Sequence, residues 1–218
     1  EISECLVGSE MCIRDSVCWA DLNNDGVINN LDRVKVGNLF PTVTGGFSTT
    51  LGYKDFSLYA RFDYALGHTL YNDLAARSLG QYQGSFNIID MVKDSWSETN
   101  QDTDIPKFYY ADQLSKKNIT RSNNGLTAVD NNSSRFYEKG DYLALREITL
   151  TWNLPKKWIN KALMSNASVY VTGQNLFYIT GYTGVSPEPA VDTTYGQGLD
   201  NGRYPTPKTV LLGLSVTF

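Results

Sequence analysis

Hydrophobic and polar residues alternate along residues 208–218 (KTVLLGLSVTF). An extended strand places every second side chain on the same face, so one face of this segment is apolar and the other is mostly small or polar. The apolar face carries Val210, Leu212, Leu214, Val216 and Phe218. The segment is therefore predicted to be a strand with one face in an apolar environment.

Four earlier segments alternate in the same way. The shared face of the first carries Phe47, Thr49, Leu51 and Tyr53. That of the second carries Phe56, Leu58, Ala60, Phe62, Tyr64 and Leu66. The third sets Ala144, Ile148, Leu150 and Trp152 on its apolar face, where Arg146 is a charged exception. The fourth spans about residues 167–178, so the pattern predicts five strands in all.

The connections between these strands alternate in length. Residues 53–55 form a tight turn, and residues 154–166 form a short connection with a helical pattern, whereas residues 68–141 and 179–207 are long. Outer-membrane barrels have short periplasmic turns and long extracellular loops. A strand of about eleven residues tilted by about 45° also spans their apolar band of about 25 Å. The chain is predicted to be all-β, the C-terminal portion of a transmembrane antiparallel β-barrel that needs further strands to close.

Composition narrows the possible functions. The chain has 218 residues and a net charge of −4, which is too acidic for a general nucleic-acid binder. No apolar run is long enough for a membrane-spanning helix. Cys5, Cys12 and Cys18 form neither a disulfide framework nor a zinc spacing. Residues 1–16 have no secretory-signal pattern and are predicted to be a non-native or disordered segment, followed by the barrel portion over residues 17–218.

One segment, residues 21–32 (DLNNDGVINNLD), has the spacing of an EF-hand-like calcium loop. Gly26 stands at position 6, where the chain turns sharply, and Ile28 stands at the apolar position 8. The predicted oxygen ligands are the side chains of Asp21, Asn23, Asp25 and Asp32 and the carbonyl of Val27. We expect a structural Ca²⁺ site, with an Asp/Asn/Gly-rich turn that holds no metal as the alternative.

Other candidate residues favour structural roles. His68 is the only histidine, which removes most Ser-His and His-metal schemes, and it is expected to be an aromatic-girdle or loop residue. The lysines of the short connection are expected to be solvated, namely Lys156, Lys157 and Lys161. Three loop tyrosines are expected to pack within the loop rather than stack on a sugar ring, namely Tyr82, Tyr109 and Tyr110. No catalytic constellation is present in the sequence, so the protein is not expected to be an enzyme.

Six motifs in order resemble the C-terminal part of SusC/RagA-type, TonB-dependent outer-membrane transporters. They are DLNNDGVINNLDRVKVGN (Asp21–Asn38), GGFSTTLGYKDFSLYARFDYALG (Gly45–Gly67), SWSETNQDTDIPKF (Ser95–Phe108), GDYLALREITLTWNLP (Gly140–Pro155), VYVTGQNLFYITGYTGVSPE (Val169–Glu188) and YPTPKTVLLGLSVTF (Tyr204–Phe218). The resemblance covers about residues 18–218. The terminal alternating strand also resembles the C-terminal signal by which outer-membrane barrels are recognised for assembly.

The resemblance implies a barrel of about 22 strands with a plug, in the outer membrane of a Gram-negative bacterium. It implies import of glycans or peptides, with TonB acting through a segment that this chain lacks. The implied partners are a SusD-like surface lipoprotein, the outer-membrane assembly machinery and membrane lipid or lipopolysaccharide, with no nucleic acid. Substrate-contacting residues cannot be assigned from it. The alternative is a soluble Ca²⁺-binding β-sandwich, such as a carbohydrate-binding module.

Overall fold

The structure, a computed structural model, describes residues 20–26, 30–32, 34–80, 90–107, 134–159, 164–188, 198–202 and 204–218. The chain divides into two compact units. The loop unit comprises Glu1–Leu39, Thr69–Glu138 and Pro189–Arg203, and the sheet unit comprises Phe40–His68, Lys139–Glu188 and Tyr204–Phe218. The cysteines and the predicted non-native segment lie outside the described residues.

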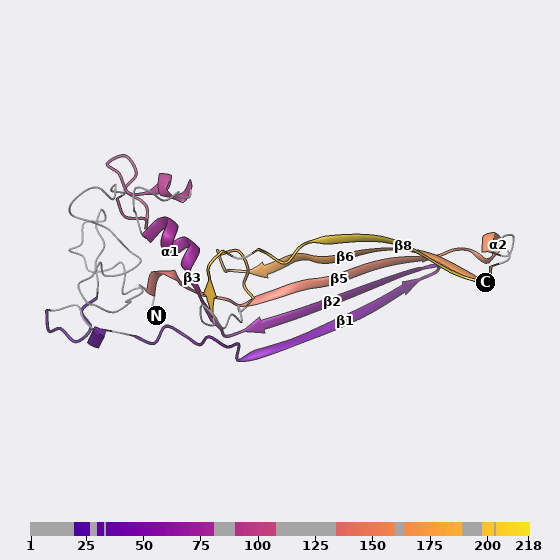
Figure 1. Cartoon of the computed structure of the whole chain (residues 1–218), viewed down its shortest axis with the longest axis horizontal. Coiled ribbons are helices and arrows are strands. Elements are labelled where there is room, and N and C mark those ends of the chain that lie inside the picture. Colours follow the sequence, from indigo (N-terminus) through magenta and orange to yellow (C-terminus); the bar gives the residue numbers. More distant parts are fainter. Residues whose placement is uncertain are drawn as a thin grey trace. The chain divides into compact units, whose positions relative to one another are not determined.

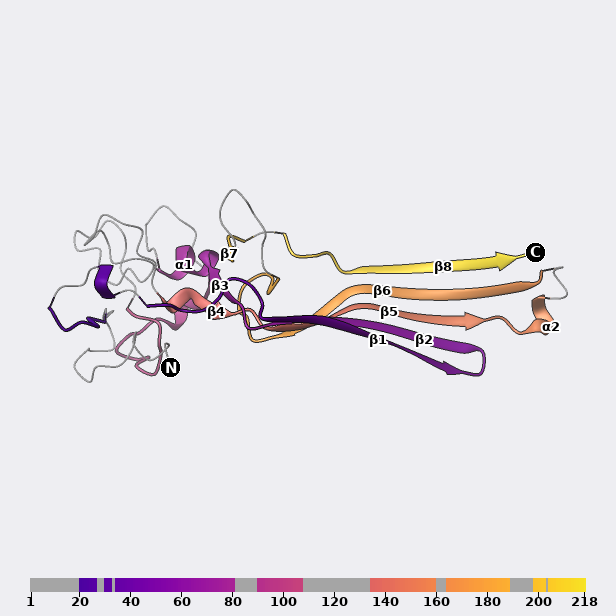
Figure 2. The same cartoon turned by 90° about the horizontal axis from the view of Figure 1, so that it is seen from below.

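The sheet unit is built on a five-stranded antiparallel sheet. Its strands lie side by side in the order β1 (Val43–Tyr53), β2 (Phe56–Leu66), β5 (Tyr142–Asn153), β6 (Asn166–Thr180) and β8 (Thr209–Thr217) (Figure 1, Figure 2). These are the five strands that the alternation predicts. Each of them pairs with the next of the five along the chain, as in an up-and-down meander.

The strand register sorts the side chains onto two faces of opposite polarity, because residues paired across antiparallel strands point to the same side. One row of paired residues runs through Leu51, Leu58, Leu150, Val171 and Leu212. The adjacent row runs through Thr50, Tyr59, Thr149, Thr172 and Leu211. We call these two sides the apolar face and the polar face. Many large side chains of the apolar face are exposed, including Leu212 at 78%.

A β-bulge in β5 corrects one detail of the predicted pattern. Arg61 pairs with Glu147 and Phe62 with Leu145, so Arg146 is an extra residue without a partner on β2. A bulge moves every later residue of its strand to the opposite face relative to a regular strand. The prediction that Ala144 shares a face with Ile148 is therefore wrong: Ala144 pairs with Asp63 and lies on the polar face.

The short connections gather at one end of the sheet, which we call the turn end. Lys54, in the β1–β2 turn, has a φ of 53°. The described part of the predicted helical connection contains the short helix α2 (Lys156–Ile159), at the same end (Figure 1). Within the described residues, no helix has the length and apolarity needed to cross a membrane.

The loop unit holds several short elements that the sequence pattern does not predict. A small sheet has the order β4 (Tyr137–Lys139), β3 (Thr69–Asn72) and β7 (Leu199–Asp200). After β3 comes helix α1 (Asp73–Gly80), and Asn72 caps it by accepting a hydrogen bond from the Ala75 amide at 3.0 Å. Three 3₁₀ turns complete the described part, η2 (Asn30–Asp32), η3 (Asp90–Asp94) and η4 (Ser134–Phe136).

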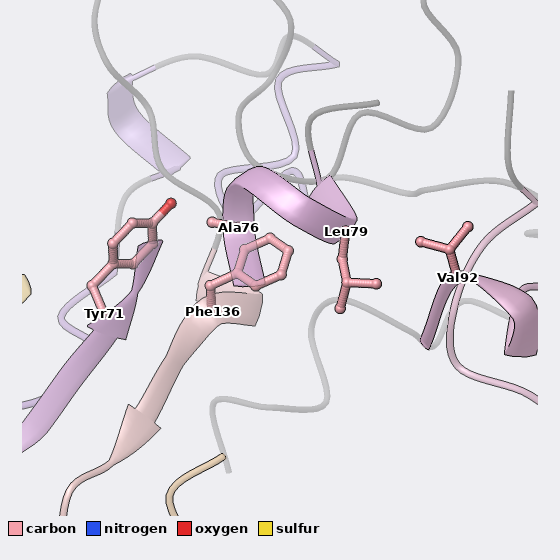
Figure 3. Packing of buried hydrophobic residues seen from close by; sticks show 5 residues of the cluster. All are labelled: Tyr71, Ala76, Leu79, Val92 and Phe136. Carbon is pink, nitrogen blue, oxygen red and sulfur yellow. The ribbon is translucent and has the colours of Figure 1, made fainter. Parts of the chain in front are cut away.

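A compact hydrophobic cluster gives the loop unit its core. It joins β3, α1, η3 and η4 through Tyr71, Ala76, Leu79, Val92 and Phe136, all of which are buried (Figure 3). The sequence separation of these residues is large, so the cluster stabilises a folded arrangement of a segment that has little regular secondary structure. The long segment after β2 is thus a packed structure in its described part.

Candidate functional site

The described residues of the EF-hand-like segment form a tight turn held by side-chain hydrogen bonds. The Asp21 carboxylate accepts hydrogen bonds from the amides of Asp25 (3.2 Å) and Gly26 (2.7 Å). Asn23 Oδ1 accepts a third from the Asp25 amide at 3.0 Å. Asn24 and Gly26 have φ values of 59° and 79°, so the chain turns sharply where the spacing requires it. The loop geometry therefore agrees with the predicted position of Gly26.

The predicted ligands are only partly brought together. Asp32 accepts a hydrogen bond from the Leu22 amide at 2.9 Å, which closes the loop, and Asp25 accepts one from the Asn23 side-chain amide at 2.8 Å. Val27 and Ile28 lie outside the described residues. Among described residues, no three His, Cys, Asp or Glu side chains are grouped closely enough to hold a metal ion. The all-oxygen set suits a hard cation such as Ca²⁺, and the site stays a prediction.

The polar face carries an ion cluster centred on Arg146, which we define as Asp63, Arg146, Tyr178 and Glu188. The Arg146 guanidinium donates two hydrogen bonds to the Asp63 carboxylate, at 2.5 and 2.9 Å, and one to Tyr178 Oη at 3.0 Å. It also forms an ion pair with Glu188, whose carboxylate accepts a hydrogen bond from Tyr178 Oη at 2.8 Å. The bulge in β5 thus turns a charge from the predicted apolar side toward partners on the polar face.

This cluster links four parts of the sheet unit. Asp63 lies on β2, Arg146 on β5 and Tyr178 on β6, whereas Glu188 lies in the segment that follows β6. The Arg146 side chain is 19% exposed, and the two carboxylates are about one-third exposed. Arg146 therefore ties the segment after β6 to the polar face by charge-assisted hydrogen bonds.

Beside the cluster, the polar face has a hollow of about 580 Å³. The side chains that β1 contributes to this face are small, because Gly46 and Ser48 occupy it next to the longer side chains of β2. The hollow is lined by Gly45, Gly46, Phe47, Ser48, Arg61, Phe62, Asp63 and Arg146. Arg61, Asp63 and Arg146 give the hollow its charged groups, and Phe47 and Phe62 add apolar lining.

His68 lies in the connection after β2, as expected of a loop residue, but it is 1% exposed rather than part of a surface girdle. Its Nε2 lies 2.9 Å from the carbonyl oxygen of Pro187, and its ring meets the edge of Tyr142 at a centroid distance of 6.2 Å. A Cβ at Gly140 would overlap the imidazole ring, which explains the glycine there. His68 and Arg146 thus hold adjacent residues, Pro187 and Glu188, of one segment.

The predicted assembly residues lie where the alternation puts them. Val210, Leu212, Leu214 and Val216 are on the apolar face of β8, and Phe218 follows the strand with 89% of its surface exposed. Their role in assembly stays a prediction. Tyr82, Tyr109, Tyr110 and Lys161 lie outside the described residues. Lys156 and Lys157 are exposed, as expected.

Sequence reasoning missed the role of the Arg146 cluster. The signal for it was available in part, because a single arginine interrupted an otherwise apolar alternation. Glu188 and Pro187 carried no such signal, since their contacts depend on how an irregular segment folds back.

Comparisons with known proteins find TonB-dependent receptors over most of the chain. TonB-dependent receptor P26 of Formosa agariphila is 33% identical over 207 residues, which cover 92% of this chain and 19% of that protein. TonB-dependent receptor P3 of the same organism is 31% identical over 206 residues with the same coverage. TonB-dependent receptor SusC of Bacteroides thetaiotaomicron is 25% identical over 202 residues, covering 92% of this chain and 17% of SusC. No protein-family model matches the chain.

A solved structure agrees with these relatives. The RagAB peptide importer in its 'closed-closed' state matches with a TM-score of 0.58 and 26% identity, over 83% of this chain and 18% of that chain. The sheet, with exposed apolar side chains on one face and polar side chains on the other, is a section of the wall of a transmembrane β-barrel. The chain belongs to the TonB-dependent receptors of the SusC/RagA type.

The chain spans 19% of the length of the two Formosa relatives. The activity, substrate and partners of a whole transporter are therefore proposals for this protein. The matched relatives are receptors and transporters, which agrees with the expectation that the chain is not an enzyme.

Proposed function

We propose that this chain forms part of the barrel wall of a transporter that imports a polar nutrient, a glycan or a peptide, across the bacterial outer membrane. The observation that carries the proposal is the two-faced sheet. Rows of Leu, Val and Phe side chains on one face suit contact with lipid tails, and the opposite face offers hydroxyls and charged groups to a water-filled lumen.

The likeness to SusC and to the RagAB importer supports two partners. A SusD-like surface lipoprotein would bind on the extracellular side, and TonB would supply the energy. The soluble β-sandwich alternative receives no support from the sheet. A sandwich needs a second sheet packed on the apolar face, and the described residues contain only the small β4-β3-β7 sheet besides the main one.

The transport proposal is tested by nutrient uptake in a Gram-negative host. The host carries the gene for the whole transporter to which this chain would belong, which we call the parent transporter. Cells are offered fluorescent peptides and fluorescent oligosaccharides, each in a strain with TonB and in a strain without it. We expect accumulation of one of the two substrate classes, and its loss in the strain without TonB. Accumulation that does not depend on the transporter gene, or that continues unchanged without TonB, would contradict the proposal.

We also propose that the loop of residues 21–32 binds Ca²⁺ and orders an extracellular segment. Asp21, Asn23, Asp25 and Asp32 would supply side-chain oxygens, and Val27 its carbonyl. Asp25→Ala in the intact parent should abolish Ca²⁺ binding measured by calorimetry, whereas Asn30→Ala, in the same loop but outside the predicted ligand set, should preserve it. Equal binding by both variants would refute this site.

A further inference from the structure

Aromatic side chains form a continuous row at the turn end of the apolar face. Tyr53 pairs with Phe56, and Phe56 pairs with Trp152 across the next strand. The rings of Phe56 and Trp152 are stacked, with centroids 6.0 Å apart and an interplanar angle of 10°. Trp158 of α2 adds a perpendicular contact to Trp152 at 5.9 Å and 83°. The row thus runs across β1, β2 and β5 and onto the short helix.

Helix α2 is oriented by its own backbone and by one buried side chain. The Pro155 carbonyl accepts hydrogen bonds from the amides of Trp158 (2.9 Å) and Ile159 (3.4 Å), and the Leu154 amide bonds to the Ala167 carbonyl at 2.9 Å. Ile159 is 2% exposed, whereas the neighbouring Trp158 is 55% exposed. The fold buries the isoleucine and leaves the larger, amphipathic indole at the surface beside Trp152.

Basic side chains accompany this aromatic row. Lys54, Lys156 and Lys157 are exposed, and Lys54 Nζ lies 5.3 Å from the centroid of the Tyr53 ring. The Asn153 amide bonds to the Asp55 carbonyl at 2.8 Å, which joins the β1–β2 turn to the end of β5 just before α2. In residues 53–56 and 152–159, Asp55 is the only acidic residue beside three lysines, so these two segments carry an excess of positive charge.

We infer that the turn end of this sheet is a docking surface for anionic phospholipid headgroups. Aromatic rings with one apolar and one polar side favour the boundary between acyl chains and headgroups, and lysines reach from this depth into the headgroup layer. The inference rests on the proposed function, because in an outer-membrane barrel the short turns face the periplasmic leaflet, which is built of phospholipid. The partner is therefore a phospholipid of net negative charge, such as phosphatidylglycerol.

The test uses the whole parent transporter in nanodiscs of phosphatidylcholine and phosphatidylglycerol. Native mass spectrometry counts the phosphatidylglycerol molecules that remain bound after release from the disc. The test variant is Lys156→Gln/Lys157→Gln. The matched control is Lys139→Gln/Lys208→Gln, which removes the same charge from exposed lysines at the opposite end of the sheet.

Each basic residue near an anionic surface contributes a factor of about five to binding. We expect the test variant to retain severalfold less phosphatidylglycerol than the wild type and the control variant to retain the wild-type amount. Equal retention by all three proteins, or an equal loss in the control variant, would overturn the inference.

Nutrient uptake by the same variants separates this inference from the proposed function. Reduced lipid retention together with wild-type uptake supports the docking surface and leaves the transport proposal intact. If the wild-type transporter takes up no nutrient but the test variant alone loses phosphatidylglycerol, the transport proposal fails and the docking surface stands.

Discussion

Removing the positive charge of Arg146 should destabilise the sheet unit. Arg146→Met keeps the length of the side chain but leaves the Asp63 and Glu188 carboxylates without their shared cation. Loss of one partner of a fully buried ion pair costs about 3–5 kcal/mol, and loss of a surface pair costs less than about 1 kcal/mol. The side chains here are 19–34% exposed, so we expect a loss of about 2 kcal/mol in the free energy of unfolding.

The loss of stability in Arg146→Met should come mainly from the unpaired carboxylates rather than from the missing guanidinium itself. Asp63→Asn/Glu188→Gln on the Arg146→Met background removes those charges, and the triple variant should regain part of the lost stability. Arg146→Lys should fall between the wild type and Arg146→Met, because an ammonium cannot donate two parallel hydrogen bonds to Asp63 and also reach Tyr178 and Glu188.

The assay is thermal unfolding of the purified parent transporter in one detergent. The unfolded fraction at each temperature is read on gels from the loss of heat-modifiable mobility. A Gln174→Met variant, on the polar face of β6, serves as a control for the introduction of methionine. The reasoning is refuted if Arg146→Met unfolds at the wild-type temperature, or if the triple variant is less stable than Arg146→Met.

Three further changes test the two faces of the sheet, a close contact of β8 and the role of the terminal residue. Leu212→Arg, on the apolar face, should make the free energy of folding into lipid vesicles less favourable by about 2–4 kcal/mol. Leu211→Arg, on the polar face, should have a much smaller effect, and equal effects of the two variants would contradict the assignment of the faces. Gly213→Ala would place a Cβ 2.2 Å from Cζ of Tyr170, so the exposed end of that ring must move and stability should fall by about 1 kcal/mol; a wild-type unfolding temperature would contradict this contact. Deleting Phe218 should lower the amount of parent protein in the outer membrane measured by immunoblot, with Leu211→Ala as a control that keeps it; equal amounts would show that Phe218 is no part of an assembly signal.

The long strands were predictable because their environment imposes a period of two. Lipid on one side and water on the other make each position either apolar or polar, which is the strongest signal that a strand can carry. For β2 the predicted bounds, Phe56–Leu66, are those of the structure. The predicted strands are shorter than β5 and β6 of the structure. The difference arises because Tyr142 and Thr180 extend past the alternating stretch and pair with each other.

The loop unit could not be predicted in the same way. Its strands are two to four residues long, too short to display a period, and α1 is a helix of eight residues. Its core joins Tyr71 to Val92 and Phe136, which are far apart in the chain. Such contacts depend on tertiary packing, to which local sequence patterns are insensitive. In the sheet unit, the contact between the buried His68 and the Pro187 carbonyl depends on tertiary packing in the same way.

Arg146 illustrates how much information a break in the alternation contains. A charged residue in an apolar row has two explanations, a charge that faces lipid or an extra residue that shifts the row. The first would cost about 2–4 kcal/mol near the membrane midplane. The second leaves a trace in the sequence, because the apolar positions are odd-numbered before Arg146, at Leu143 and Leu145, and even-numbered after it, from Ile148 onward. This change of parity identifies a bulge, and it follows that the arginine belongs to the lumen side of the barrel wall, where carboxylates can meet it.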